Sequence, residues 1–303
     1  MTTIDIFLAL VVNLLYGSTF TFGKYVMAVF TPVFVYCLRF LLAGLLVTPF
    51  NIKKIKYDKD EFFWMFVTAT FNAISFVFLA IGLSKLDSSV SAIINRVDIP
   101  FTIVLSALIY KEKIHWNTIL GIVICFFSIY LISGDVKITE IKYIFINLVC
   151  PFFMSCANIT SKKTKLESSV RTPIINLISG LELLLYCLFF EDMLKVPFTE
   201  ITMQSWFSLF YLTIFATHVC YVGLFYLLKK YNSSKIMPYN FVRPIFTIVL
   251  GLIVLGEVIT TKKIIGTILI ISGVLVSQLL TKKTSEKEIG EIKNAEKGDM
   301  EKD

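Results

Sequence analysis

Long uninterrupted apolar segments make up most of this chain, and its polar residues gather in short stretches between them. A helix needs about 20 predominantly apolar residues to cross the hydrocarbon core of a bilayer. Ten segments meet that requirement: roughly 4–23, 31–50, 62–83, 88–110, 116–134, 143–161, 171–190, 205–228, 234–256 and 262–280. The pattern therefore predicts an all-α polytopic membrane protein with ten transmembrane helices and no separate soluble domain.

Composition supports a membrane setting. Hydrophobic residues make up 56% of the chain and charged residues only 17%, against about 25% charged residues in soluble domains. The apolar segments lack the alternation in ~10-residue units that is typical of outer-membrane barrels. The net charge of +7 resides in loops and the C-terminal tail, so we expect the lipid bilayer as a partner and no nucleic acid.

The cysteines give no sign of metal or redox chemistry. All six fall inside predicted spans and none forms a CxxC pair. Buried, unpaired cysteines of this kind usually pack as small apolar residues. We expect no metal site, no cofactor and no disulfide.

The basic residues of the loops predict the orientation of the chain. If the N-terminus is cytoplasmic, the cytoplasmic loops and tail carry nineteen Lys and Arg residues and the opposite loops carry seven. Cytoplasmic loops carry such an excess, so both termini should face the cytoplasm from an inner (plasma) membrane. The first span lacks the basic flank and cleavage site of a signal peptide. The charged segment 282–303 should be a disordered cytoplasmic tail.

The second half of the chain repeats the first. A shift of 145 residues aligns segment 88–121 with segment 233–266. Identical pairs include Asn95/Asn240, Glu112/Glu257 and Gly121/Gly266. The chain therefore divides into a first repeat, residues 1–137, and a second repeat, residues 138–281, with five spans each. Five is odd, so the repeats should be inverted, an architecture typical of transporters with a substrate site near mid-bilayer.

Six ionisable residues fall near the centres of predicted spans, where a charge costs roughly 2.5–3.5 kcal/mol on insertion scales. They are Arg39, Arg96, Asp98, Glu182, His218 and Arg243. Such residues usually face the interior of the bundle or a water-filled cavity. With His218 neutral, three cations stand against two anions, and an anionic group on a substrate would complete the count.

Spans four and nine carry matching polar stripes at helical spacing. The first stripe consists of Ser88, Ser91, Asn95, Asp98, Thr102 and Ser106, and the second of Asn240, Arg243, Thr247 and Gly251. Lipid does not satisfy polar side chains, so both stripes should face the interior. Substrate-binding residues are expected among Asn95, Asn240, Thr102 and Thr247.

The repeat places Asp98 and Arg243 at similar depth on opposite walls of that interior. Two interpretations stay open: a structural ion pair that locks the two halves, or a pair that borders the substrate cavity and opens and closes during transport. Arg96 lies two positions from Asp98, and residues two apart on a helix do not share a face. We therefore expect Arg96 to pack against a neighbouring helix.

Other candidates have weaker support. Arg39 is equally compatible with a binding and a scaffolding role, and Tyr16 and Tyr239 lie beside polar positions where they would pack on a substrate. Glu182 and His218 are candidates for proton coupling, because a buried carboxyl group and an imidazole can titrate near neutral pH.

Three features of the spans have structural interpretations. Asn13, Asn72 and Asn158 could add amide groups to the cavity. Glu112 and Glu257 close spans four and nine, where they should orient the turn into the next helix. Pro100 and Pro244 lie inside the same two spans and should kink them.

Several short motifs match a known family. They are Tyr16-Gly17-Ser18-Thr19-Phe20, Arg39-Phe40, the blocks from Pro100 to Glu112 and from Pro244 to Glu257, and the helices after Gly121 and Gly266. Over about residues 4–280 the chain resembles the EamA family of the drug/metabolite transporter superfamily. That resemblance implies a ten-helix carrier with a central cavity between inverted halves. The chain departs from the family pattern at Tyr16, where Trp is common, and at Lys111, where the second repeat has Gly256.

Together these features predict a secondary transporter, not an enzyme, that moves a small polar metabolite such as an amino acid or related zwitterion. A larger solute, such as S-adenosylmethionine, a nucleotide precursor or an amphipathic drug, is the alternative. An intramembrane enzyme is disfavoured, because no HExxH motif, metal cluster or nucleophile with a base is present, and the absence of a Walker loop excludes direct drive by ATP. A homodimer is compatible with the sequence.

Overall fold

The computed structural model describes residues 1–51, 58–111, 114, 116–192, 201–231, 236, 239–240 and 242–277. The predicted tail 282–303 and Glu112 lie outside these residues. The described residues are helical and contain no strand. The main helices are α1 (Thr3–Val26), α2 (Pro32–Asn51), α3 (Lys59–Lys85), α4 (Ser88–Asn95), α5 (Asp98–Tyr110), α6 (Trp116–Ser133), α7 (Ile141–Thr160), α8 (Ser168–Phe190), α9 (Met203–Thr213), α10 (Cys220–Lys230), α12 (Val242–Leu255) and α13 (Thr261–Leu275).

Seven helical segments of the described chain are long and apolar enough to cross a membrane. They are Thr3–Val26, Lys59–Lys85, Ser88–Ile109, Trp116–Ser133, Ile138–Lys163, Ser168–Phe190 and Met203–Leu224. Two shorter apolar helices, Pro32–Thr48 and Val242–Leu255, accompany them. The predicted all-helical membrane class is confirmed, and most boundaries fall within a few residues of those predicted.

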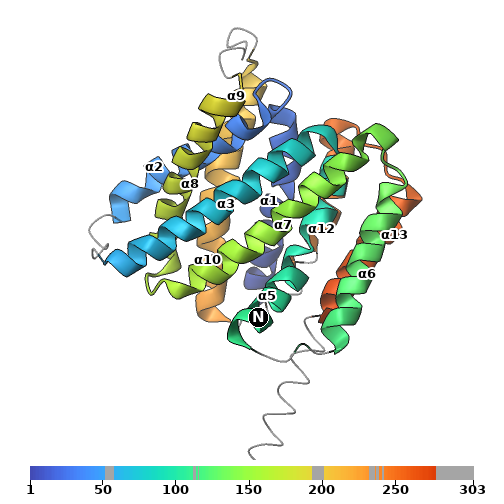
Figure 1. The fold of residues 1–303 in the computed structure, drawn as a ribbon. Helices are drawn as coiled ribbons and strands as arrows, with labels where there is room; N and C mark the ends of the chain where they lie inside the picture. Colours follow the sequence, from blue (N-terminus) through green and yellow to red (C-terminus); the bar gives the residue numbers. More distant parts are fainter. Residues whose placement is uncertain are drawn as a thin grey trace, which may run out of the picture.

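The helices form one bundle in which partners far apart in sequence lie side by side. In Figure 1, α2 and α8 pair at one edge and α6 and α13 pair at the opposite edge. Between these edges α3 packs along α7, and α1 packs along α12. Helices α4 and α5 lie between α7 and the α6–α13 pair, so both of them reach the middle of the bundle.

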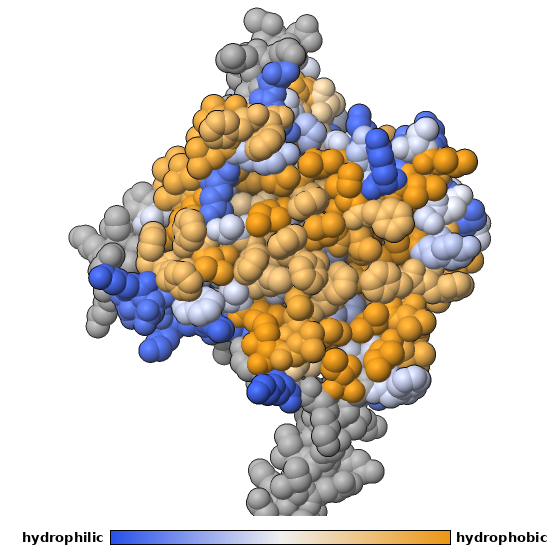
Figure 2. Space-filling view, in the orientation of Figure 1, coloured by the Kyte–Doolittle hydropathy of each residue, from blue (hydrophilic) through white to orange (hydrophobic). Residues whose placement is uncertain are grey.

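The outer surface of the bundle is apolar. Large side chains such as Val123 and Phe127 on α6, and Leu185 and Leu188 on α8, are more than half exposed. Figure 2 shows apolar residues across the front of the bundle and hydrophilic residues gathered near its ends. Water would oppose so large an apolar surface, whereas hydrocarbon would not, so the surface fits a bilayer.

The fourth predicted span, the helical segment Ser88–Ile109 of the structure, is interrupted by a tight turn at Arg96 and Val97. Helix α4 ends at Asn95, and α5 begins at Asp98 after Arg96 and Val97. Pro100 is the third residue of α5, where a helix leaves backbone N–H groups unpaired in any case. The proline therefore fits the start of a second helix. Pro244 occupies the same third position in α12 (Val242–Leu255).

The eighth predicted span also departs from a regular α-helix. Residues Ile214–Val219 form a π-helical segment between α9 and α10. Within it, Thr217 Oγ1 bonds to the carbonyl oxygen of Leu212, five residues earlier. Segments of this kind are rare and occur frequently at functional sites.

Close contacts between small residues join α6 to α13. A Cβ atom added to Gly121 would lie 2.5 Å from the carbonyl oxygen of Gly273, and Ser128 Oγ donates a 2.7 Å hydrogen bond to the carbonyl oxygen of Gly266. Gly121 and Gly266 are equivalent in the sequence repeat, and the same shift pairs Ser128 with Gly273. Each contact is therefore the counterpart of the other. Small residues at such contacts let membrane helices approach closely.

Candidate functional site

A polar cavity of about 380 Å³ lies in the middle of the bundle. Its lining comes from helices of both halves of the chain, α1, α2, α3, α4, α5, α7, α10 and α12. The polar lining residues are Tyr16, Thr19, Tyr36, Arg39, Asn72, Asn95, Arg96, Asp98, Asn158, Tyr221 and Arg243. Cavities of this size, with a few placed polar groups, are typical of small-molecule sites.

Arg243 is held in one orientation by neutral partners. Its Nε atom donates a 2.6 Å hydrogen bond to Asn13 Oδ1, and its Nη2 atom donates a 2.9 Å bond to Asn240 Oδ1. The guanidinium carbon lies 4.3 Å from the centre of the Tyr16 ring, within range of a cation–π interaction. These contacts fix the guanidinium without neutralising its charge, so it is positioned to bind an anion.

Asp98 stands at the start of α5 with an unpaired oxygen. Its Oδ1 atom is buried and has no hydrogen-bond partner. Although Asp98 and Arg243 line the same cavity, no ion pair joins them. Asp98 and Arg243 therefore do not form the structural ion pair of the first interpretation, and both residues border the cavity as the second interpretation expects. A buried acceptor without a partner is costly, and the ammonium group of a solute would satisfy it.

Arg96 also lines the cavity, in contrast to the expectation from its spacing. The expectation assumed one continuous helix, on which Arg96 and Asp98 would face different ways. Because the helix ends at Asn95 and restarts at Asp98, both side chains reach the same cavity. Arg96 forms no side-chain hydrogen bond or ion pair with the described residues.

Arg39 is anchored to the π-helical segment. Its Nε atom donates a 3.0 Å hydrogen bond to Thr217 Oγ1, and its Nη2 atom donates a 3.3 Å bond to the carbonyl oxygen of Ala216. The residue is only 6% exposed, yet it borders the cavity. As with Arg243, its partners are neutral, so its charge is retained.

The cavity continues toward one end of the bundle, here called the Arg171 end. A second hollow of about 220 Å³ shares Asn72, Asn158 and Tyr221 with the cavity and extends to Arg171 and Thr68. We call this hollow the vestibule. Arg171 bonds within its own α7–α8 hairpin, to Thr164 Oγ1 at 2.9 Å, Ser168 Oγ at 3.0 Å and the carbonyl oxygen of Ser161.

Aromatic side chains fill the opposite side of the cavity. The Phe76 ring lies 4.9 Å from that of Tyr36 and 4.6 Å from that of Phe40, measured between ring centres. Tyr36 and Phe40 are buried, with exposed fractions of 1% and 3%. These three rings, the aromatic plug, pack against one another in the wall of the cavity.

At the opposite end of the bundle, the Glu257 end, polar contacts join distant residues. The Glu257 carboxylate accepts hydrogen bonds from Ser88 N at 2.5 Å, Ser89 N at 3.2 Å and Ser89 Oγ at 2.7 Å. It thereby caps α4, whose own N-cap residue Asp87 makes no side-chain bond of that kind. A positive φ of 66° at Gly256 turns the chain after α12 and brings Glu257 there, a conformation that glycine adopts without steric cost.

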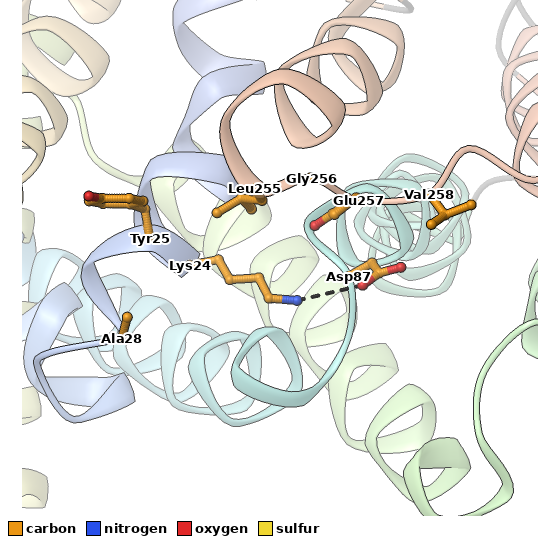
Figure 3. Close-up of a pocket in the computed structure, with 8 residues that line it drawn as sticks. All are labelled: Lys24, Tyr25, Ala28, Asp87, Leu255, Gly256, Glu257 and Val258. Carbon is orange, nitrogen blue, oxygen red and sulfur yellow. Dashed lines mark ion pairs between the residues drawn. The ribbon is translucent and has the colours of Figure 1, made fainter.

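Ion pairs surround this cap. Asp87 pairs with Lys263 at 2.6 Å and with Lys24 at 3.8 Å. Figure 3 shows Lys24 extending from α1 toward Asp87, with Glu257 beside them along the wall of a surface hollow. Nearby, partial burial works to raise the pKa of Asp135, but hydrogen bonds from Thr260 and Lys262 together hold that pKa below its ordinary value.

Of the predicted substrate-binding residues, Tyr16, Arg39, Asn95, Asp98 and Arg243 line the cavity. Asn95 also donates a 3.0 Å hydrogen bond to Asn147 Oδ1, so it links α4 to α7. Behind the lining, Asn240 orients Arg243.

The remaining predicted residues lie away from the lining. Thr102 bonds to the carbonyl oxygen of Asp98, and Thr247 bonds to that of Gly17, where α12 packs against α1. Tyr239 packs in an apolar cluster at the start of α1. A hydroxyl group on a polar stripe can donate its hydrogen bond to a backbone carbonyl oxygen instead of facing the cavity, and both threonines do so.

The two candidates for proton coupling also lie off the cavity. Glu182 accepts a 2.7 Å hydrogen bond from Thr70 Oγ1 between α8 and α3, and its Oε2 atom is buried without a partner. His218 lies in the π-helical segment next to Thr217, and its Nε2 atom is likewise unpaired.

Sequence reasoning missed Arg96 as a lining residue, although a signal was present. An acidic residue and a proline within one turn, as in Asp98-Ile99-Pro100, are typical of the start of a helix. Applied inside an apolar segment, that signal would have placed the break before Asp98. The aromatic plug carried no such signal, because its residues look like any other apolar side chains of a span.

Comparison with known proteins places the chain among transporters. The sequence profile of the EamA-like transporter family matches residues 3–134 and again residues 141–279. A protein of Salmonella typhimurium described as a probable amino-acid metabolite efflux pump is 25% identical over 288 residues, 91% of this chain and 95% of that protein. An uncharacterized transporter of Archaeoglobus fulgidus is also 25% identical, over 89% of this chain and 97% of its own length.

A solved crystal structure, described only as that of a protein, has a TM-score of 0.62 with 14% sequence identity. It covers 92% of this chain and 99% of its own, and at this identity it shows a shared fold alone. The family match spans nearly the whole described chain and includes the residues that line the cavity. The protein is a membrane transporter rather than an enzyme, and it belongs to the EamA-like transporter family.

Proposed function

We propose that the protein is a secondary carrier that moves a small polar metabolite, an amino acid or a related zwitterion, by alternating access. The observation that carries this proposal is the pairing of opposite charges on one cavity. Asp98 Oδ1 has no partner, and Arg243 is held by amide oxygens without losing its charge. An amino acid carries an ammonium group for the first and a carboxylate for the second.

Alternating access would rest on ten spans arranged as two inverted five-helix repeats, residues 1–137 and 138–281. The reciprocal contacts of Gly121 with Gly273 and of Ser128 with Gly266 support this, because a two-fold axis between repeats generates such pairs. So does Lys111, whose φ of 55° ends α5 in the left-handed region, as Gly256 ends α12. The left-handed region is unfavourable for a residue with a Cβ atom. The geometry that Lys111 shares with Gly256 is therefore not a local preference of lysine.

We place the Arg171 end at the cytoplasm of an inner (plasma) membrane, with both termini on that side. The excess of lysines and arginines in the loops of that end supports this orientation. In this arrangement the cavity communicates with the cytoplasm through the vestibule and is closed toward the outside. Cysteines introduced at Lys162 and Lys85 should then react from opposite sides of the membrane. Reaction from the same side would exclude the inverted arrangement.

A larger solute remains the second candidate, and the vestibule favours it. S-adenosylmethionine carries a nucleoside as well as an amino acid, and the vestibule shares lining residues with the cavity. The nucleoside could occupy the vestibule while the amino-acid part occupies the cavity. Neither Glu182 nor His218 lines the cavity. If either residue couples proton movement to transport of an amino acid, it does so without contacting the solute.

The experiment is counterflow in proteoliposomes, with a panel of amino acids and nucleosides and with or without a pH gradient. Asp98→Asn and Arg243→Gln should each reduce transport of the accepted solute by about tenfold or more, because a buried charge loses its partner. Lys85→Gln, an exposed charge outside the cavity, is the control and should leave the rate unchanged. Normal transport by both cavity variants would overturn the assignment of the site.

A further inference from the structure

The charges along the cavity and vestibule do not balance. Among the described residues that line them, four are cations and one is an anion. The cations are Arg39, Arg96, Arg171 and Arg243, and the anion is Asp98. No described carboxylate lies within ion-pair distance of any of the four arginines. A cavity with an excess of one charge concentrates solutes of the opposite charge.

The arginines differ in how far their hydrogen-bonding capacity is already used. A guanidinium has five N–H donors. Arg243 and Arg39 each donate one hydrogen bond from Nε and one from Nη2 to neutral oxygens. The Arg96 side chain is partly buried at the cavity wall and commits no donor to the described residues, so Arg96 is the member of the set with the most hydrogen-bonding capacity left for a ligand.

A neutral amino acid would leave the donors of Arg96 without an acidic partner. Its carboxylate and ammonium groups would satisfy one arginine and Asp98. Arg96 and two other arginines would then stay without a charged partner. Arg96 lies two residues from Asp98, at the break between α4 and α5, so a group bound to Arg96 would belong to the same solute as the ammonium on Asp98.

Building on the proposed function, we infer that the substrate is an acidic amino acid or a similar zwitterion with a second acidic group and a net negative charge. Arg243, oriented by Asn13 and Asn240, holds the α-carboxylate. Asp98 accepts the ammonium group. Arg96 binds the second acidic group and thereby sets the specificity for charge.

Three probes of nearly equal size separate these roles. L-glutamate carries all three groups, L-glutamine lacks the second charge, and glutarate lacks the ammonium group. The purified full-length protein should bind glutamate about tenfold or more tightly than glutamine, and also than glutarate, which Asp98 repels. Binding is measured by titration in detergent, and counterflow in proteoliposomes confirms that the bound probe is carried.

Two substitutions with opposite outcomes test the residues. Arg96→Gln should bring the preference for glutamate over glutamine down to about twofold or less, with glutamine binding retained. Asp98→Asn should remove the discrimination against glutarate. Lys137→Gln, an exposed cation at the Glu257 end, is the matched control and should change neither ratio. A purely structural role for Arg96 would weaken all probes together and leave the ratios intact.

The outcomes distinguish this inference from the proposed function. Equal binding and counterflow of glutamate and glutamine would overturn the inference and leave the amino-acid carrier standing. The same holds if Arg96→Gln keeps the native preference. Failure of every amino acid to bind or exchange would overturn both.

Discussion

The two ends of the bundle border the same cavity but are built differently. At the Glu257 end, hydrogen bonds and ion pairs join α4 to the segment after α12 and to α13, across more than 160 residues. At the Arg171 end, Arg171 bonds only to residues within its own hairpin, at most 10 positions away. Glu61 adds a 2.7 Å bond from Lys165 N, again to that hairpin. Both ends therefore join distant parts of the chain, but through different elements: α4 to the segment after α12 and to α13 at the Glu257 end, and Glu61 to Lys165 and Asp5 to Lys230 (2.8 Å) at the Arg171 end.

Among substitutions that weaken one end of the bundle, Glu257→Ala should have the largest effect. It removes the acceptor of three hydrogen bonds, and bonds to a charged group contribute roughly 1.5–3 kcal/mol each. We expect the closed form to lose about 4.5 kcal/mol or more, which is over about a thousandfold in the ratio of closed to open forms. The measurement is the labelling rate of Leu79→Cys, a cavity position near the plug, by an impermeant maleimide applied at the Glu257 end.

Two variants control that experiment. Glu257→Gln keeps one oxygen acceptor and should give an intermediate rate. Glu140→Ala removes a carboxylate from the same end without touching the cap, so its rate should equal that of the native protein. Unchanged labelling in Glu257→Ala would mean that the cap does not hold this end closed.

The aromatic plug should respond next. Phe40→Leu shortens a buried side chain that packs on Phe76, and a substitution between large apolar residues usually costs less than about 1.5 kcal/mol. We expect labelling of Leu79→Cys from the Glu257 end to rise by about tenfold, because space opens beside the ring. Phe207→Leu, at a residue 60% exposed on the outer surface, should have no effect. If both variants behave alike, the plug is not the barrier.

The ion pairs at the closed end should matter less. The Asp87 side chain is 43% exposed, and exposed ion pairs contribute about 0.2–1 kcal/mol. Asp87→Asn should therefore raise the labelling rate only a few-fold at low salt, with a smaller difference at high salt because ions screen the pairs. An effect as large as that of Glu257→Ala would show that the pairs, and not the cap, close this end.

The smallest effect is expected at the open end. Arg171→Gln should raise KM for an anionic substrate about two- to threefold and leave kcat unchanged, because a vestibule charge steers encounter more than it stabilises the bound state. The difference should vanish at high salt. Lys162→Gln, an exposed cation on the same hairpin, is the control. A fall in kcat would place Arg171 in the transport step itself.

The positions of the helices could be predicted because a bilayer imposes one strong requirement, a long apolar segment. The six ionisable residues inside the predicted spans stood out for the same reason. Sequence could not assign their partners, since Asn13 and Arg243 are 230 positions apart, and only packing of α1 on α12 brings them together.

The role of Glu257 shows the limit of local reasoning. Its position at the end of a span predicted a part in the following turn, and its carboxylate instead caps a helix that begins 169 positions earlier. Thr102 and Thr247 show the reverse case. Their polar stripe indicated a lining role, but each hydroxyl group is satisfied by a backbone carbonyl, an alternative that sequence spacing does not distinguish.

The contact between α6 and α13 bears on how such a bundle rearranges. Gly121 and Gly273 leave no room for even a methyl group between their backbones, so sliding or tilting there would force atoms into one another. The α6–α13 pair should therefore behave as a stator, and the other helices would pivot against it. Gly121→Ala should then slow turnover by forcing α6 and α13 apart, at a site far from any bound solute.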